Sequence, residues 1–481
     1  MQGPLILDRL LDYSSRDVVS FHVPGHKNGR ILDQYNYRNF KEKLSSIDTT
    51  EIPGTDNLHD PEEMIKEAQE RAARFFGADH TYFLVNGTSC GNMAMLMTVG
   101  NPGDKIIIPR DCHKSVSYGL IMGGLIPVYV NPEIHDDYYM PMGIQSKTIE
   151  KALVEHPDAK AVLITYPNYY GICSDIVEIA RIVHQYGKIL LVDEAHGAHL
   201  NLSDTLPISA LEAGADMVVQ SIHKTLPSFT QSSMLHVKSD RIDQERLRFM
   251  LSMHQSSSPS YLLMMSLDLA RAIVEQDGRH LMSQLLDHID YFHEKAREME
   301  GLHMFDERLT GRFGVKSLDR TKLVIDMSAL GISGVLLEKL LRTKHHIQVE
   351  MCSTKNVVAV ASIGNTKDDF DRLLNALKEI GDGKGFNRRK VEIPLYSYHI
   401  PSMRITPREA VYSPKIERLF KESEGSICGE YVIPYPPGIP ILCPGEEITA
   451  DLIEYINALL ENGINLIGPK DATLEKIQVI G

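Results

Sequence analysis

Two stretches decide the fold: KILLVDEAHGAH at residues 188–199 and DMVVQSIHKTL at residues 216–226. In each stretch, a short and nearly continuous apolar run ends abruptly in charged or hydroxyl side chains. Such runs are typical of parallel strands that are buried on both faces of a sheet. Because functional side chains collect at the carboxyl ends of parallel strands, we expect Asp193 and Lys224 to lie at one edge of a sheet.

Further apolar runs extend this pattern on both sides of the two stretches. They are TYFLV (81–85), KIIIP (105–109), IPVYV (126–130), AVLITY (161–166) and SMLHV (233–237). Helical or mixed segments separate them. The clearest helix is predicted between a cap at Asp60 and a stop at Gly77, with Pro61 and Glu63 completing its N-terminal signal. The alternation of buried strands and helices predicts an α/β fold with a mostly parallel central sheet.

Changes in this pattern divide the 481 residues into four parts. The predicted parts are an N-terminal arm (1–60), a large domain (61–300), a small α/β domain (301–385) and a C-terminal segment (386–481). The polar, glycine-rich run GDGKGFNRRK at 381–390 is expected to be the linker before the C-terminal segment. No internal repeat is visible.

Composition and charge narrow the class of protein. With 43% hydrophobic and 24% charged residues, the chain can bury a sizeable core. A net charge of −14 disfavours nucleic-acid binding, and no apolar run is long enough to cross a bilayer. The six cysteines form no C-x-x-C pair, and the N-terminus has neither a basic leader nor a small-residue cleavage site. We therefore expect a cytoplasmic protein with reduced thiols.

One strand end carries small polar residues at the start of a predicted helix. The run Asn86-Gly87-Thr88-Ser89 follows TYFLV. Backbone N–H groups at a helix N-terminus, together with the hydroxyls of Thr88 and Ser89, suit a phosphate. The same turn is also an ordinary helix cap, so by itself it is a weak signal.

The other two strand ends carry an acid and an amine. Asp193 emerges from a buried strand, where it either pairs with a cation or is a satisfied polar group. Lys224 follows the next strand, with Ser221 and His223 beside it. A partly desolvated lysine has a lowered pKa and can act as a Schiff-base nucleophile, whereas most lysines are solvated surface groups. A phosphate cradle, an acid for a pyridine nitrogen and a Schiff-base lysine are together what pyridoxal 5′-phosphate (PLP) requires.

The chain resembles the Orn/Lys/Arg decarboxylase family of fold type I PLP-dependent enzymes over nearly its whole length. The matching runs are FHVPGHKNG (21–29), TDNLHDPE (55–62), NGTS (86–89), RDCHKS (110–115), DEAHGAH (193–199), QSIHKTL (220–226), TPREA (406–410) and YPPGIPILCPGE (435–446). The resemblance implies a transferase-like α/β fold, with a mostly parallel sheet in the large domain and a smaller α/β C-terminal domain.

The resemblance also implies roles for individual residues. Lys224 matches the Schiff-base lysine and Asp193 the partner of the pyridine nitrogen. His113 matches the imidazole that stacks on the ring, and His196 lies close to the ring. The phosphate contacts are Thr88, Ser89, Ser221 and His223. Either Lys224 or His223 would return the proton to the substrate.

The activity implied by the resemblance is decarboxylation of a basic amino acid in polyamine biosynthesis. Arginine, which gives agmatine, is the first choice, ahead of lysine and then ornithine. We expect a homo-oligomer, a dimer or larger, that uses no metal and binds neither nucleic acid nor membrane. Larger family members carry an N-terminal wing domain that this sequence lacks. We therefore expect a member of the shorter subfamily, and we do not expect the decamer of the wing-bearing enzymes.

A cationic substrate tail needs an acid at the far end of its pocket. Glu446, in the last of the matching runs, is the sequence candidate for that acid. The alternative is an exposed glutamate that caps a helix starting near Thr449. We expect Glu446→Gln to raise KM if the first interpretation holds.

Other classes of protein fit the sequence less well. DEAH at 193–196 is also a helicase tetrapeptide, but the chain has no G-x-x-x-x-G-K-[ST] loop to hold the phosphates of a nucleotide. A metal site built from His22, His26, His196 and His199 lacks an H-E-x-x-H pattern. Intact Asp193 and Lys224 disfavour a silent binding protein. An aminotransferase or aldolase is the nearest competing PLP enzyme, and the PGHK and PYPPG runs favour a decarboxylase.

Overall fold

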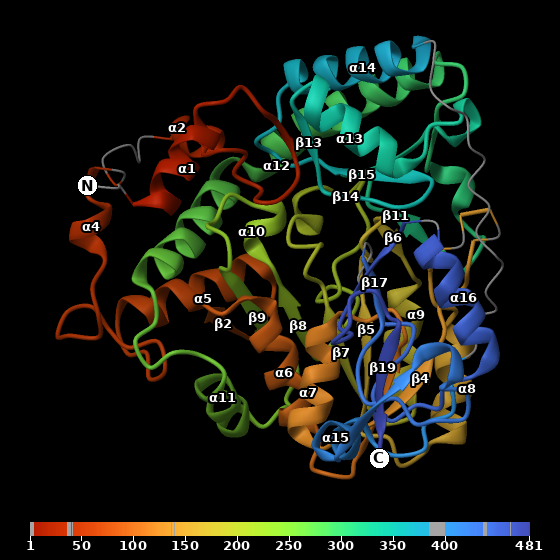
Figure 1. Ribbon diagram of the computed structural model, residues 1–481. Helices are drawn as coiled ribbons and strands as arrows, with labels where there is room; N and C mark the ends of the chain where they lie inside the picture. The colour runs from red at the N-terminus through yellow and green to blue at the C-terminus, as the bar shows by residue number, and fades with distance from the viewer. Residues whose placement is uncertain are drawn as a thin grey trace.

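The computed structural model describes residues 4–35, 40, 42–135, 137–138, 140–383, 400–435, 440–461 and 463–481. Most of the predicted linker at 381–390 lies outside the described residues. Figure 1 shows a large domain around a central sheet, a small domain above it, and the C-terminal segment packed against the lower right of the large domain.

The central sheet has seven strands in the order β2-β9-β8-β7-β5-β3-β4. Their bounds are β2 His80–Leu84, β3 Lys105–Pro109, β4 Ile126–Val130, β5 Ala161–Thr165, β7 Ile189–Asp193, β8 Met217–Gln220 and β9 Ser233–Val237. All seven match predicted apolar runs, which confirms the predicted α/β sheet. Strand β9 runs opposite to the other six strands and therefore pairs antiparallel with both β2 and β8. The connection from β8 to β9 holds a single four-residue helix, α10 (Ile222–Thr225), which is too short for a parallel crossover.

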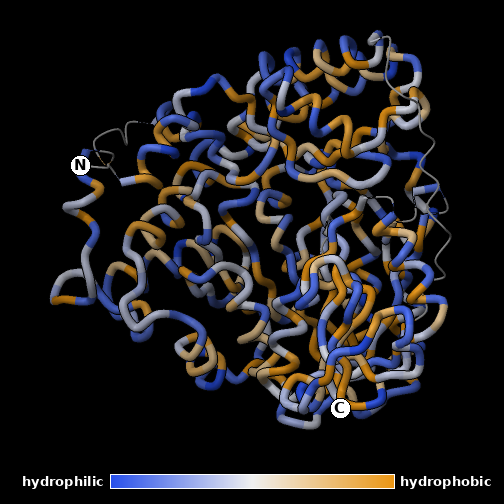
Figure 2. The backbone as a smooth tube through the Cα atoms, viewed as in Figure 1, coloured by the Kyte–Doolittle hydropathy of each residue, from blue (hydrophilic) through white to orange (hydrophobic). Residues whose placement is uncertain are grey.

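Helices cover both faces of this sheet, because successive side chains of each strand point to opposite sides. In β7, Leu190 and Val192 pack in one core with helices α9 (Ile176–Gln185) and α12 (Tyr261–Arg297). Leu191 packs in a second core. The helices that contribute to this second core are α6 (Gly87–Val99), α7 (Lys114–Gly123) and α11 (Gln244–Met253). Figure 2 shows hydrophobic and hydrophilic segments alternating along the outer helices, as this two-sided packing requires.

The helix predicted from Asp60 to Gly77 begins later than expected. Helix α5 runs over Met64–Phe76, and its N-cap Glu63 makes no side-chain cap hydrogen bond. The capping carboxylate is instead Asp56, which accepts hydrogen bonds from the backbone N–H groups of Glu62, Glu63 and Ile65 at 2.9 Å. The predicted stop is confirmed, because Gly77 adopts the left-handed conformation at the C-cap.

The small domain contains a four-stranded sheet in the order β10-β12-β15-β14. Its strands are β10 His303–Met304, β12 Lys322–Asp326, β14 Met351–Cys352 and β15 Asn356–Val360, and its main helices are α13 Gly334–Lys344 and α14 Lys367–Asp382. The N-terminal arm joins this domain, because β1 (Val19–Phe21) pairs in parallel with β13 (Ile347–Val349). The arm therefore packs on its own chain.

The C-terminal segment has a hydrophobic core of its own. Its strands pair as β16 (Lys415–Leu419) with β19 (Lys476–Ile480), and as β17 (Ile433–Tyr435) with β18 (Asn465–Ile467). Its helices are α15 (Pro407–Tyr412) and α16 (Ala450–Glu461). Helix α15 packs on α7 of the large domain, where Arg408 donates a hydrogen bond to the Met122 carbonyl at 2.8 Å.

No helix in the described ranges combines the length and the apolar character that a membrane crossing requires.

Candidate active site

Lys224 lies in α10, directly after β8, at the carboxyl edge of the sheet. Its Nζ atom is 2.9 Å from Nε2 of His196 and 5.8 Å from the centre of the Tyr169 ring. Burial lowers the pKa of the amine, although the carboxylates of Asp193 and Glu350 partly oppose that effect. A lowered pKa increases the neutral, nucleophilic fraction of the amine, which is the property that Schiff-base chemistry needs.

Asp193 ends β7, the strand next to β8, and only 2% of it is exposed. Its Oδ2 accepts a hydrogen bond from Nδ2 of Asn92 at 2.7 Å, and its Oδ1 accepts one from the N–H of Ala195 at 3.1 Å. Both donors are neutral. A buried carboxylate with neutral donors is well placed to pair with a cation that enters the site.

Asn92 is a site residue that the sequence analysis missed. It lies on α6 and is fully buried, and its Nδ2 also contacts Oγ of Ser115 at 3.0 Å. Ser115 Oγ is in turn 2.8 Å from Nδ1 of His113. A hydrogen-bonded chain therefore runs from Asp193 through Asn92 and Ser115 to His113. The signal in the sequence was an amide within the otherwise apolar helix CGNMAMLM.

His113 forms the N-cap of α7 and accepts a hydrogen bond from the N–H of Ser115 at 3.2 Å. Burial lowers the pKa of its imidazole, with Lys224 adding to the effect and Asp193 opposing it. The ring is therefore neutral at pH 7 and anchored through Nδ1. A neutral, anchored imidazole can stack on a flat ligand.

The residues predicted to contact phosphate lie at the ends of two different elements. Thr88 is in the first turn of α6, and Ser221 precedes α10; their hydroxyl oxygens are 3.0 Å apart. Ser89 follows in the same turn of α6 and is half-buried. Helix α6 thus presents its N-terminus and two hydroxyls beside the Lys224 turn, which suits an anion.

His223 is oriented by the backbone. Its Nδ1 is 2.8 Å from the carbonyl of Ser232, and so must carry the proton that this contact requires. Burial lowers the pKa of His223 to about 4, so the ring is neutral at pH 7. We infer that His223 presents Nε2 toward any ligand.

His196 is buried beside Lys224, and burial holds the pKa of its imidazole well below the usual value. Its carbonyl accepts a hydrogen bond from Nζ of Lys322 at 3.3 Å, and Lys322 is paired with Asp319 at 2.7 Å. Asp319 also contacts His199 at 3.1 Å. This buried network, which includes Asp319 and Lys322 of the small domain, holds the DEAHGAH turn in place.

The N-terminal arm packs against the Lys224 turn. The N–H of Gly25 donates to the carbonyl of His223 at 2.7 Å, and a Cβ at Gly25 would lie 2.7 Å from backbone atoms of Thr225 and Leu226. Only glycine allows this approach. Lys27 is also buried, and its Nζ donates to the Val360 carbonyl of the small domain at 3.0 Å. The PGHK run therefore links the turn that carries Lys224 to the small domain.

These residues fit PLP on observations of this structure. The amine of Lys224 has a lowered pKa, Asp193 is a buried carboxylate with neutral donors, and a pair of hydroxyls lies at a helix N-terminus. Among the described residues, the buried atoms His196 Nδ1 and Asn92 Oδ1 have no hydrogen-bond partner. Such orphaned polar atoms are costly unless a ligand or water satisfies them.

The proposed role of Glu446 does not agree with its surroundings. Glu446 is 1% exposed and forms a buried ion pair with Arg110, whose Nη2 donates to Oε2 at 2.7 Å. The N–H of Cys443 donates to the same oxygen at 2.8 Å. Its charge is already matched, so a substrate cation would have to displace Arg110. Glu446 is therefore neither the free acid that we expected nor an exposed helix cap.

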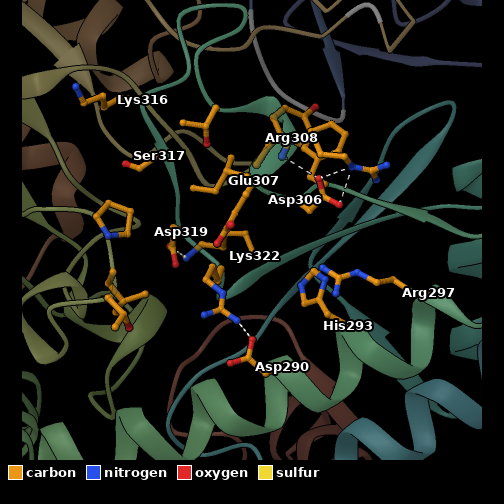
Figure 3. A pocket seen from close by; sticks show the side chains of 18 of the residues that line it. Asp290, His293, Arg297, Asp306, Glu307, Arg308, Lys316, Ser317, Asp319 and Lys322 are labelled. Carbon is orange, nitrogen blue, oxygen red and sulfur yellow. Dashed lines mark hydrogen bonds and ion pairs between the residues drawn. The ribbon is translucent and has the colours of Figure 1, made fainter.

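A cavity of about 1230 Å³ beside α12 is not lined by Lys224, Asp193 or His113. It is lined by the end of α12 and by residues 305–322, and its charged side chains are mostly paired (Figure 3). Arg308 contacts Asp306, and Lys322 contacts Asp319. Matched charges leave little for a ligand to neutralise, so we assign the chemistry to the Lys224 site.

The described residues also contain no group of three His, Cys, Asp or Glu side chains that could hold a metal ion.

Comparison with known proteins gives two family matches that cover most of the chain. Residues 4–369 match the model "Orn/Lys/Arg decarboxylase, major domain". Residues 394–468 match "Orn/Lys/Arg decarboxylase, C-terminal domain".

Individual relatives and solved structures agree with these matches. The chain is 40% identical to an arginine decarboxylase of Bacillus subtilis (strain 168), over 98% of this chain and 96% of that protein. It is 26% identical to the lysine decarboxylase LdcA of Pseudomonas aeruginosa, over 94% of this chain and 75% of that protein. The structure of the E. coli constitutive lysine decarboxylase superposes with a TM-score of 0.77 at 21% identity, covering 100% of this chain and 82% of that one. This superposition confirms the predicted fold type I architecture.

Proposed function

The chain belongs to the Orn/Lys/Arg decarboxylase family, as the resemblance predicted, and from this premise we propose a PLP-dependent arginine decarboxylase that produces agmatine. The observation that carries the proposal is the placement of the Lys224 amine, whose pKa is lowered, and of the buried Asp193 carboxylate at the ends of adjacent strands. Agmatine is a polyamine precursor, so we also propose a cytoplasmic role in polyamine biosynthesis.

The protein's own residues would hold the cofactor. Lys224 would bind its aldehyde carbon, Asp193 its ring nitrogen, and Thr88, Ser89, Ser221 and His223 its phosphate. When bound, PLP supplies a protonated ring that takes up the electron pair left at Cα as CO₂ departs. Asp193 would keep that ring nitrogen protonated, because a close carboxylate favours the cation. His113 would lie against the cofactor and exclude water from it.

The proton that returns to Cα is assigned to Lys224. His223 is neutral at pH 7, and its Nδ1 proton is committed to the Ser232 carbonyl. Burial lowers the pKa of the Lys224 amine, and the carboxylates of Asp193 and Glu350 oppose this effect only in part, so its protonated form would be a stronger acid than an ordinary lysine. A protonated amine beside the reacting carbon is the better general acid.

The proposal is tested by measuring CO₂ release from arginine, lysine and ornithine by the enzyme loaded with PLP. We expect kcat/KM to be highest for arginine. The relative at 40% identity is named an arginine decarboxylase, whereas the lysine enzyme is only 26% identical. Higher kcat/KM for lysine or ornithine would reassign the substrate. Transamination without CO₂ release would point to an aminotransferase.

We further propose Glu350 as the acid that recognises the cationic tail. It follows β13 in the small domain, and its Oε2 accepts a hydrogen bond from the N–H of Val23 at 2.9 Å. Burial lowers the pKa of both Lys224 and Lys27, and the Glu350 carboxylate opposes this effect at both amines, which indicates that it lies near the active site. Among the described residues, Oε1 of Glu350 has no hydrogen bond.

Replacing Glu350 with glutamine is expected to raise KM for arginine about 10- to 100-fold with little change in kcat, because uniform binding of the tail charge is lost. Steady-state kinetics measures both constants. Inhibition by norleucine, whose tail is uncharged, should not change. Glu338→Gln on α13 is the matched control and should behave as wild type. An unchanged KM in Glu350→Gln would leave the tail-binding acid unassigned.

We also propose that the enzyme is a homo-oligomer in which helix α1 (Leu5–Ser14) packs on a second copy of the chain. The helix buries none of its residues against its own chain. Its apolar side chains include Ile6, 78% exposed, and Leu10, 60% exposed. Apolar side chains four residues apart share one helix face, and an uncovered face of this kind favours association.

The double variant Ile6→Asp/Leu10→Asp is therefore expected to shift the enzyme toward smaller species, because each aspartate would be buried unpaired at the interface. Light scattering over a range of protein concentrations measures the change. Arg9→Gln, on the polar face of the same helix, should keep the wild-type mass. An active wild-type monomer would refute the oligomer.

A further inference from the structure

A buried ion pair joins the C-terminal segment to the turn that carries His113. Arg110 directly follows β3, and its guanidinium is bidentate: Nη2 donates to Glu446 Oε2 at 2.7 Å and Nη1 donates to Oε1. Nη2 also donates to the Ile441 carbonyl at 3.1 Å. The guanidinium carbon lies 4.7 Å from the centre of the Tyr129 ring. Among the described residues, the hydrogen-bond acceptors of the Arg110 guanidinium all come from the C-terminal segment, whereas its backbone N–H donates to the Val130 carbonyl at 2.9 Å.

Glu446 is itself held firmly. Its Oε2 accepts a second hydrogen bond from the N–H of Cys443 at 2.8 Å. Its carbonyl accepts one from the N–H of Cys428 at 2.7 Å, and its backbone forms a bridge with Met403. The carboxylate is therefore fixed at the core of the C-terminal segment and cannot follow Arg110 if that side chain moves.

The turn from Arg110 to His113 is short, with Arg110 and Cys112 buried and Asp111 and His113 half-buried. Only Asp111 and Cys112 separate the two residues, and 2% of Cys112 is exposed. The N–H of Cys112 donates to the Pro109 carbonyl at 3.2 Å, which closes the turn. Because close-packed backbone cannot absorb a displacement over two residues, a shift of Arg110 moves His113.

We propose that Glu446 is a positioning residue that acts through Arg110 to hold His113 in place at the cofactor site. The C-terminal segment would then set the geometry of an active site built in the large domain. This inference rests on the proposed function, because it assumes that His113 faces bound PLP. A buried guanidinium is tolerated only with its counter-charge and with its donors satisfied, so the pair has one stable arrangement.

Two variants separate positioning from folding. Glu446→Asp keeps the charge balance but shortens the carboxylate's reach by one methylene, so Arg110 and His113 must shift. The double variant Arg110→Met/Glu446→Leu replaces the pair by apolar side chains, a change that buried sites often tolerate. We expect both to bind PLP with KM little changed, and to lose about 10- to 100-fold in kcat, because small misplacements at a reacting centre are costly.

Alkylation of Cys112 reports the position of the turn without turnover. The thiol is buried in the wild type, so an alkylating reagent should modify it slowly in both the apoenzyme and the holoenzyme. We expect faster modification in both variants, measured by peptide mapping. Cys173, buried in the large domain far along the sequence, is the internal reference and should keep its rate.

Arg408→Gln is the matched control. Arg408 also joins the C-terminal segment to α7, but at the exposed far end of that helix. It should keep wild-type kcat and slow Cys112 labelling. The proposal is overturned if the double variant has wild-type kcat and slow labelling. It also fails if neither variant yields folded enzyme, because the pair would then serve folding alone. A wild-type enzyme inactive on all three amino acids would overturn the proposed function instead.

Discussion

Replacing Lys224 with alanine is expected to abolish decarboxylation, with a loss of about 10⁴-fold or more in kcat, because the amine that binds the cofactor's aldehyde is removed. The fold should survive, since within the described part of the chain the Lys224 side chain makes a single hydrogen bond, to His196. Turnover is measured as CO₂ release. Retention of the cofactor is measured by absorbance after borohydride reduction and dialysis, which should leave PLP attached to wild-type enzyme but not to the variant.

Lys295→Ala is the control for this result. Lys295 lies exposed on α12 and, among the residues that the structure describes, its ion pair is with Glu298, so the variant should keep both turnover and cofactor retention. A Lys224→Ala enzyme that kept the reduced cofactor after dialysis would show that another group binds the aldehyde.

The second large effect is expected for Asp193→Asn. A neutral amide cannot hold a proton on the ring nitrogen, and losing the charge partner of a buried cation costs about 3–5 kcal/mol. At about 1.4 kcal/mol for each tenfold change in rate, kcat should fall roughly 10²- to 10⁴-fold. PLP should still bind, because the lysine and the phosphate contacts remain. Single-turnover rates and the cofactor spectrum measure the two effects separately.

Asp216→Asn provides the matched control for Asp193→Asn. Asp216 is equally buried but lies at the opposite end of the neighbouring strand, where it accepts a hydrogen bond from the N–H of Leu190 at 2.8 Å. The change there should lower the unfolding temperature and leave kcat within a few-fold of wild type. Single-turnover rates of Asp193→Asn within tenfold of wild type would remove Asp193 from its proposed role.

Some of the site could be predicted because strand ends meet at one edge of a parallel sheet. Asp193 ends one buried strand and Lys224 lies in the turn after the neighbouring strand, so the sheet brings them to the same edge. Asn92 could not be placed in this way. Its contact with Asp193 joins a helix to a strand 101 residues later, and an amide in an apolar helix has no spacing that names its partner.

Glu446 shows most clearly that the sequence does not specify which residue pairs with a buried acid. The sequence marks it as an acid in a family-like run, and a buried acid needs a cation. The cation that pairs with Glu446 is Arg110, 336 residues earlier in the same chain. Glu446 was predicted to bind the cationic tail of the substrate, whereas its charge partner is Arg110, because the C-terminal segment packs against the large domain.

The sequence by itself determined the strands, their mostly parallel order and the edge at which the chemistry collects, because hydrophobic periodicity is a local property of the chain. Only the tertiary structure decided which residues from other parts of the chain pack against that edge of the sheet. Asp319 and Lys322 of the small domain fix the His196 turn, and Gly25 of the arm contacts the Lys224 turn. These contacts depend on close approach between segments far apart in sequence, and neither composition nor spacing specifies them.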